Sequence, residues 1–354
     1  MKSLRNILKP NNFQFLNQRS ISSAKRQVQE IRIPVPAGYI AGKWWGPQDK
    51  RPILTFHGWQ DNSGSFDRLV PHLPEDIPIL AIDSPGHGFS YKLPPGMAYH
   101  NIDATIITKQ IKDYFGWEKI SLMGHSLGAI LSYTYGYLFP KDIDFIVCID
   151  GLHPLVNPKK LDRVSQSIEE QIKYDALNSS KEEPPSYSIQ EMAERMHKAT
   201  AKSVDVSTAK YILYRNIAPS KKNPGKFYFN RDARLKVGPL QVHDTAEMIR
   251  VAEKVIFPLH VTKADKSPFF GNQSLFQEIN AVLKKCNKNY EFRNVPGVHH
   301  GHLNDPECVS GLITNFIRKH DQFDRSTGGL KDEMKVDESI YPMFKYKKEI
   351  LGEL

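Results

Sequence analysis

The sequence contains few cysteines and no long apolar run, and each absence excludes a class of protein. Only three of the 354 residues are cysteines, and Cys148, Cys286 and Cys308 stand far apart without a CxxC pair. This spacing argues against a disulfide framework and against a thiolate zinc site, and it is typical of a reducing compartment. Because no run of 18 or more apolar residues occurs, the sequence predicts no transmembrane helix.

Acidic residues are absent from the first 29 positions, which carry six of the nine net positive charges. This basic, serine-containing segment has the composition of a mitochondrial transit peptide, and it lacks the apolar stretch of a secretory signal. The alternative is a disordered terminus of a cytoplasmic protein, and in both cases residues 1–27 are excluded from the fold prediction. No basic block interleaved with aromatic residues occurs elsewhere, so no nucleic-acid partner is predicted.

The whole chain, with 40% hydrophobic and 10% aromatic residues, has the composition of a globular protein. Short apolar segments alternate with helical patterns at residues 103–115 and 127–139. Strands are expected at residues 28–35, 39–45, 52–56, 77–82, 120–123, 145–149, 256–262 and 290–294. This alternation predicts an α/β fold with a mostly parallel central sheet flanked by helices.

Residues 151–254 interrupt the alternation with helical patterns and no convincing strand. A capping box at residues 188–191 opens one of these helices. A helical insert at this point is expected to form a lid over the carboxyl edge of the sheet. The predicted organisation is a core of residues 28–150 and 255–320, a lid of residues 151–254 and a weakly patterned tail of residues 321–354.

The motif Gly-His-Ser-Leu-Gly at residues 124–128 lies between a predicted strand and a predicted helix. In that setting G-x-S-x-G is a nucleophile elbow, a tight turn that projects the serine hydroxyl from the top of the sheet. Gly124 and Gly128 would relieve collisions around the turn, and the helix amino terminus favours developing negative charge. Ser126 is the candidate nucleophile; the alternative is a tight turn with an ordinary exposed serine.

A serine nucleophile needs a base, and a carboxylate to orient that base. The loop after the last predicted strand offers His299, His300 and His302. No carboxylate or cysteine accompanies these histidines at ligand spacing, so no metal site is predicted. For the acid, Asp265 is the first choice because it follows the strand beyond the lid. Asp150, which directly follows the strand at residues 145–149, is its rival.

Four sequence blocks resemble the α/β-hydrolase superfamily: HGW at 57–59, DSPGHGFS at 83–90, GHSLG at 124–128 and GVHHGHLNDP at 297–306. Within it, HGWQDN at 57–62, HHGHL at 299–303 and YFNRDARL at 228–235 are similar to the animal serine hydrolase-like proteins. The superfamily pattern implies that His299 is the base, with His300 and then His302 as fallbacks. It also implies that the backbone amides of Leu127 and Trp59 form the oxyanion hole.

These features predict a serine hydrolase that cleaves a carboxylic ester or thioester through an acyl-enzyme. Apolar lid positions suggest a small-molecule acyl or aromatic ester as substrate, and no cofactor is implied. Arg231, Asp232 and Arg234 could contact a substrate acid or form an ion pair within the lid. Two alternatives stay open: a non-catalytic module that binds a ligand or protein, and a C–C bond hydrolase that uses the same triad.

Overall fold

The computed structural model describes residues 26–156, 163–180, 182–238, 240–268 and 272–353. The predicted transit peptide therefore lies outside the described residues, apart from its last two positions. Across the described ranges, no helix combines the length and the apolar character needed to cross a lipid bilayer.

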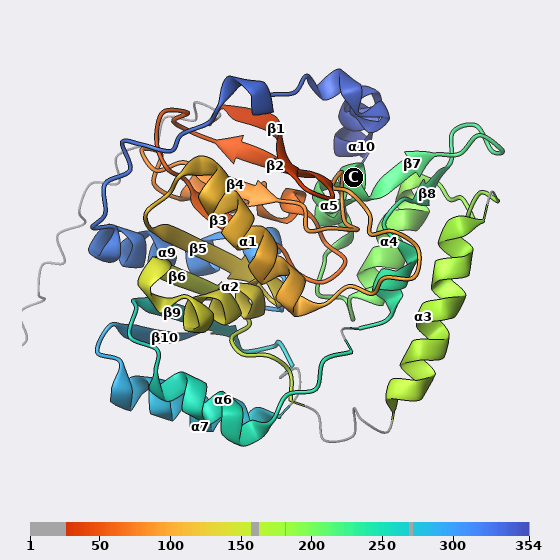
Figure 1. The fold of residues 1–354 in the computed structure, drawn as a ribbon. Helices are drawn as coiled ribbons and strands as arrows, with labels where there is room; N and C mark the ends of the chain where they lie inside the picture. Colours follow the sequence, from red (N-terminus) through yellow and green to blue (C-terminus); the bar gives the residue numbers. More distant parts are fainter. Residues whose placement is uncertain (1–25, 157–162, 181, 239, 269–271, 354) are drawn as a thin grey trace, which may run out of the picture.

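An eight-stranded sheet in the order β1-β2-β4-β3-β5-β6-β9-β10 forms the centre of the fold (Figure 1). β2 runs antiparallel to both β1 and β4, and the remaining neighbours are parallel. The strands are β1 (Val28–Val35), β2 (Gly38–Trp45), β3 (Ile53–Phe56), β4 (Ile79–Ile82), β5 (Ile120–His125), β6 (Ile143–Ile149), β9 (Leu259–Ala264) and β10 (Tyr290–Val295). The predicted α/β fold with a mostly parallel sheet is confirmed.

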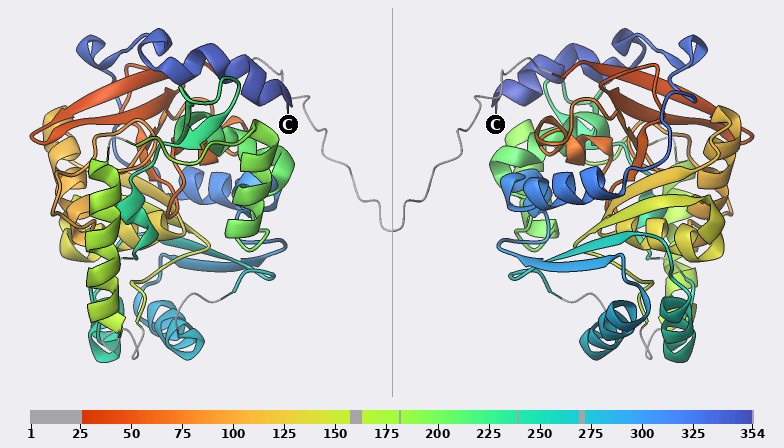
Figure 2. Two further views of the ribbon diagram at one scale, coloured as in Figure 1. Left: turned by 90° about the vertical axis from the view of Figure 1, so that its right-hand side faces the viewer. Right: turned by 90° about the vertical axis from the view of Figure 1, so that its left-hand side faces the viewer.

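Helices cover both faces of the sheet because successive strand residues point to opposite sides. Leu54 and Leu122 pack into a cluster with four helices, while their neighbours Ile53 and Met123 pack into a second cluster on the other face. The first face carries α1 (Asn101–Phe115), α2 (Leu127–Leu138), α6 (Thr245–Glu253) and α7 (Gln273–Cys286), and the second carries α9 (Glu307–His320). Figure 2 shows these layers from the two sides of the molecule.

The insert after β6 is helical, but it also contains a short hairpin. Its helices are α3 (Val164–Ser179), α4 (Ile189–Ala199) and α5 (Val206–Asn216), followed by β7 (Ile217–Pro219) and β8 (Phe227–Phe229). The antiparallel pairing of β7 with β8 corrects the expectation that this segment holds no strand. α6 packs on the main sheet through Met248 and Ala252, so it belongs with the core and not with the lid.

The tail after residue 320 is part of the hydrophobic core and not a separate appendage. Met334 is fully buried in the main cluster, and Lys335 forms a β-bridge with Ile31 of β1. Further along, Met343 and Ile350 join the lid helices α4 and α5 in a third cluster. α10 (Lys347–Glu353) lies beside α5 in Figure 1, so the tail ties the lid to the edge of the sheet.

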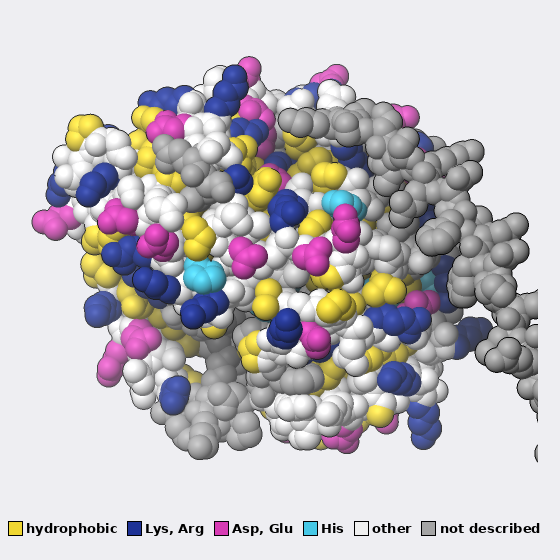
Figure 3. Space-filling view, turned by 180° about the vertical axis from the view of Figure 1, so that it is seen from behind, with side chains coloured by type: hydrophobic (Ala, Val, Ile, Leu, Met, Phe, Trp, Pro, Cys, Tyr) yellow, Lys and Arg dark blue, Asp and Glu magenta, His cyan; other side chains and the backbone are white. Residues whose placement is uncertain are grey.

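Charges of both signs are interspersed on the face seen from behind. Lys and Arg side chains alternate there with Asp and Glu and with apolar side chains (Figure 3). This face therefore does not present one continuous stripe of positive charge.

A buried ionic cluster joins α5 of the lid to the sheet. Arg215 donates to both carboxylate oxygens of Glu30 at 2.7 and 2.8 Å, and its Nη2 donates to Asp83 Oδ2 at 2.8 Å. All three side chains are buried. The guanidinium carbon also lies 4.4 Å from the centroid of the Phe89 ring. This cluster links α5 to β1 through Glu30 and to the segment after β4 through Asp83.

We expect Arg215→Ala to lower the free energy of unfolding by about 3–5 kcal/mol, because it leaves two buried carboxylates without their main counter-charge. Urea denaturation monitored by circular dichroism measures the change. Arg293→Ala is the control, since Arg293 is 52% exposed and its ion pair with Glu291 spans 3.8 Å. The control should change the same free energy by less than about 1 kcal/mol, and equal losses in the two variants would contradict the role given to the cluster.

Candidate active site

Ser126 occupies a strained turn between β5 and α2. Its φ of 53° lies in the left-handed region, which a non-glycine residue adopts only when the surrounding structure holds it there. The Ser126 amide donates to the Ile149 carbonyl at 2.9 Å. A Cβ on Gly124 would lie 2.1 Å from the Gly128 oxygen, and one on Gly128 would lie 2.0 Å from the Phe56 oxygen. The two glycines are therefore required by close backbone approach, as the motif predicts.

His299 faces this serine from the loop that follows β10. Its Nε2 lies 2.8 Å from Ser126 Oγ, and its Nδ1 pairs with Asp150 Oδ2. Burial lowers the pKa of His299, and the hydrogen bond with Asp150 opposes that effect. The net result is a pKa below the ordinary value, so His299 is a neutral imidazole at neutral pH and can accept a proton.

Asp150 directly follows β6 and is held by several donors. Its Oδ1 accepts from the Ala264 amide at 2.9 Å and from Lys263 Nζ at 3.0 Å, and Ser267 Oγ donates to its Oδ2. Burial alone would raise the pKa of Asp150, but His299, Ser267 and Lys263 together lower it well below its usual range. The side chain is thus a fixed negative charge against the Nδ1 edge of His299.

The expectation that Asp265 orients His299 is wrong for this structure. Asp265 is exposed, and its Oδ1 accepts from the Gly297 amide at 2.9 Å. Its own amide donates to the Val295 carbonyl at 3.0 Å. Asp265 therefore holds the loop that leads to His299, while the rival Asp150 contacts the ring. The reason is backbone geometry. Asp150 follows β6, the strand next to β9, and with a φ of 48° its carboxylate reaches His299 in the loop after β10.

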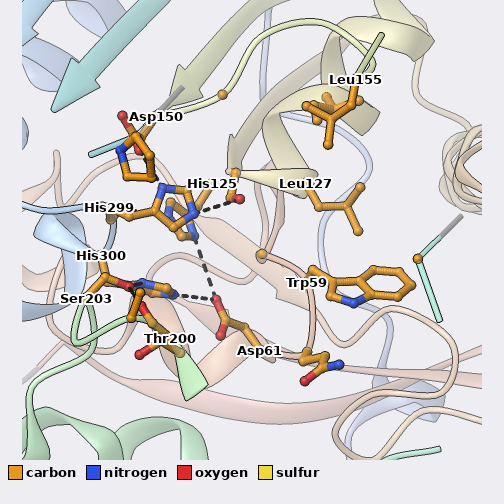
Figure 4. A pocket seen from close by; sticks show the side chains of 18 of the residues that line it. Trp59, Asp61, His125, Leu127, Asp150, Leu155, Thr200, Ser203, His299 and His300 are labelled. Atoms are coloured by element: carbon orange, nitrogen blue, oxygen red, sulfur yellow. Dashed lines mark hydrogen bonds and ion pairs between the residues drawn. The ribbon is translucent and has the colours of Figure 1, made fainter. Parts of the chain in front are cut away.

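Two backbone amides belong to residues that line the same cavity as the serine. The Leu127 amide is at the first position of α2, where a helix leaves its N–H groups without intrahelical partners. The Trp59 amide belongs to the loop after β3, and both residues line the cavity that contains Ser126 (Figure 4). Among the described residues, neither amide donates a hydrogen bond to another group. The assignment of these two amides to an oxyanion hole stays a prediction.

A second acid–histidine group lies beside the first. Asp61 Oδ2 is 3.3 Å from His300 Nε2 and 3.7 Å from His125 Nδ1 (Figure 4). Burial alone would raise the pKa of Asp61, but His300 and His125 lower it well below its usual value. His125 Nε2 lies 2.9 Å from the carbonyl oxygen of His299, so this group supports the backbone that carries the base. Sequence reasoning missed it, although Asp61 is part of the HGWQDN block.

The two fallback histidines are engaged elsewhere. His300 Nδ1 lies 2.8 Å from Ser203 Oγ of the lid, and His302 Nε2 lies 2.7 Å from Ser65 Oγ. Neither ring contacts Ser126, so of the three histidines the structure brings His299 to the serine.

The rings of His125, His299 and His300 also form the one group among the described residues whose nitrogens could converge on a metal ion. One nitrogen of each lies within 4.8 Å of the others. Nitrogens of these rings already form hydrogen bonds with Ser126, Asp150, Ser203 and the His299 carbonyl. The contacts favour a hydrogen-bonded network over a coordination site.

Comparison with known proteins places this geometry in a family. A family model described as alpha/beta hydrolase fold matches residues 51–180. A Drosophila melanogaster protein named as a probable serine hydrolase is 33% identical over 296 residues, covering 82% of this chain and 88% of its own. The serine hydrolase-like protein of Danio rerio is 30% identical over 328 residues, covering 89% and 97% of the two chains. This chain belongs to the α/β-hydrolase family.

The structure agrees with that membership, and the resemblance to animal serine hydrolase-like proteins is confirmed. The crystal structure of a hypothetical protein from Pseudomonas aeruginosa PAO1 matches this α/β hydrolase with a TM-score of 0.69 at 28% identity. The match covers 82% of this chain and 99% of the bacterial one.

A cavity of about 1150 Å³ lies between the core and the lid of this α/β hydrolase. Ser126 and His299 are in its wall, together with residues of α2, α4 and the loop after β8. Leu127, Ile130, Leu155 and Met196 give the wall an apolar part. A small molecule in this cavity would lie against the Ser126 hydroxyl and be largely removed from water.

We expect Asp150→Asn to lower kcat for a p-nitrophenyl ester by a factor on the order of 10⁴, because an amide no longer stabilises the imidazolium. The variant should also move the acid limb of the kcat/KM profile to lower pH. Burial lowers the pKa of His299 and Asp150 raises it, so removing the carboxylate lowers that pKa further.

Asp265→Asn is the matched control, because it makes the same chemical change at the end of β9, the strand next to β6. It should keep kcat within a few-fold of the wild type and leave the acid limb in place. A loss confined to Asp265→Asn, with Asp150→Asn active, would contradict the assignment of the acid.

Proposed function

We propose that this protein is a serine hydrolase that cleaves a carboxylic ester or thioester through an acyl-enzyme intermediate. The observation that carries the proposal is the unbroken contact chain from Ser126 Oγ to His299 Nε2, and from His299 Nδ1 to Asp150. The names of related proteins support it, since an esterase of Mycobacterium tuberculosis is 27% identical over 153 residues, 43% of this chain.

In the first half-reaction, Ser126 Oγ attacks the carbonyl carbon of the substrate while its proton passes to Nε2 of His299. The amides of Leu127 and Trp59 donate to the oxyanion, and each such donor is worth roughly 10²–10³ in rate. The tetrahedral intermediate then collapses as the C–O or C–S bond breaks. Nε2 returns the proton to the leaving alkoxide or thiolate, and the acyl group stays on Ser126.

In the second half-reaction, water attacks the acyl carbon and gives its proton to Nε2 of His299. The second tetrahedral intermediate expels Ser126 Oγ, which takes the proton back from Nε2, and the carboxylic acid leaves. Asp150 keeps its negative charge throughout and stabilises the imidazolium at each stage. Because the pKa of Asp150 lies well below its usual range, this carboxylate is ionised at neutral pH.

A fluorophosphonate probe tests the proposal, because it phosphonylates a serine only when the serine is activated by its base. We expect label on Ser126 in the wild type and no label in Ser126→Ala. The same wild-type protein should hydrolyse p-nitrophenyl esters, and Ser126→Ala should reduce the rate to background.

The same assay separates the alternatives. A folded wild-type protein that takes no label and turns over no ester or thioester would favour a non-catalytic binding module. Label on Ser126 without turnover of any ester or thioester would favour a C–C bond hydrolase built on the same residues.

A further inference from the structure

Arg231 is a lid arginine whose guanidinium has no hydrogen bond and no ion pair within 4.0 Å among the described residues. Its recorded contact is with the Phe229 ring, whose centroid lies 4.8 Å from the guanidinium carbon. Arg234, three residues later, already has several hydrogen-bond acceptors. Its Nη2 donates to Asp232 Oδ2 at 2.7 Å, and its guanidinium also donates to the backbone carbonyls of Leu93 and Pro94. The expected ion pair within the lid therefore forms between Asp232 and Arg234, and it leaves Arg231 out.

Arg231 lines the same cavity as Ser126. Its side chain is partly buried, and burial lowers its pKa, an effect that the charge of Asp61 only partly offsets. Asp61 is not a direct partner, because its carboxylate is held by His300 and His125. A carboxylate bound at this point would accept charge-assisted hydrogen bonds from a guanidinium that no acceptor among the described residues occupies.

Cationic side chains outnumber acidic ones in the described part of the cavity wall. Asp61 and Asp150 are the acidic residues in the described part of the cavity wall, and both are bound to histidines. Lys263 is paired with Asp150. The other cationic side chains in the wall are Arg195, Lys198, Arg231 and Lys266, and of these Arg231 is the one that is not exposed. The cavity therefore favours a substrate with negative charge.

We propose that Arg231 binds a carboxylate carried by the substrate, so that the preferred substrates are esters or thioesters of a dicarboxylic type, with a free carboxylate remote from the bond that is cleaved. A guanidinium presents two parallel N–H groups that match the two oxygens of a carboxylate. This inference rests on the proposed hydrolase function and adds the chemical class of its substrate.

Two esters of equal acyl length test the inference: mono-p-nitrophenyl adipate, which carries a free carboxylate, and p-nitrophenyl hexanoate, which does not. For the wild type we expect kcat/KM to be higher for the adipate. In Arg231→Gln the ratio of the two kcat/KM values should fall by about 10- to 100-fold, the effect of losing hydrogen bonds to a charged group. Arg231→Lys keeps the charge but not the paired N–H groups, and it should give an intermediate ratio.

Arg195→Gln is the matched control, because it removes the same charge from the wall of the same cavity at an exposed position. Arg195 lies 3.8 Å from the centroid of the Tyr187 ring, and the ratio should stay within about twofold of the wild type. If Arg195→Gln lowers the ratio as much as Arg231→Gln, the general potential of the cavity governs the preference and the inference is wrong.

The experiment separates failure of the inference from failure of the proposed function. Hydrolysis of both esters with no preference for the adipate, or with a preference that Arg231→Gln leaves unchanged, overturns the inference alone. If neither ester is hydrolysed and Ser126 takes no fluorophosphonate, the proposed function fails and the inference fails with it. Should Arg231→Gln not fold, as judged by circular dichroism, the ratio in Arg231→Lys decides the matter.

Discussion

The left-handed turn at Ser126 is the constraint on which the rest of the site depends. A non-glycine residue in this conformation costs on the order of 1–3 kcal/mol, and packing around the turn must hold it in place. β5, which leads into the turn, is buried along its whole length, and α2, which leaves it, packs into the main core. Gly151, two residues after the end of β6, packs closely against the turn, because a Cβ there would lie 2.5 Å from the Ser126 carbonyl oxygen. The neighbouring strands β5 and β6 and the helix α2 therefore hold the turn that carries the hydroxyl.

Electrostatics then decides how that hydroxyl can react. Two buried acids stand near each other, and each is bound to its own histidine: Asp150 to His299 and Asp61 to His300. This division keeps both carboxylates ionised and leaves His299 neutral, which is the state a general base needs. Asp150 is paired with Lys263 and His299, and Asp61 contacts His300 and His125. Neither acid forms an ion pair with Arg231, so its charge is available to a ligand.

Much of the fold and part of the site could be predicted from the sequence. Apolar periodicity located the eight strands, and the setting of GHSLG indicated Ser126, because both signals are local. The choice between Asp150 and Asp265 depends on contacts between segments that are distant in the sequence. Both residues follow strands that are neighbours in the sheet, and the φ of 48° at Asp150 brings its carboxylate to His299. The β7–β8 hairpin and the burial of Met334 depend equally on contacts between distant segments.

Asp150 accepts the Nδ1 proton of His299, and Nε2 of the same ring faces Ser126. Proton NMR of the low-field region measures this directly, with the His299 resonance assigned by its absence in His299→Gln. We expect a strongly deshielded Nδ1 proton in the wild type and in Asp265→Asn, and its loss or a large upfield shift in Asp150→Asn. A resonance that survives unchanged in Asp150→Asn and disappears in Asp265→Asn would contradict this arrangement.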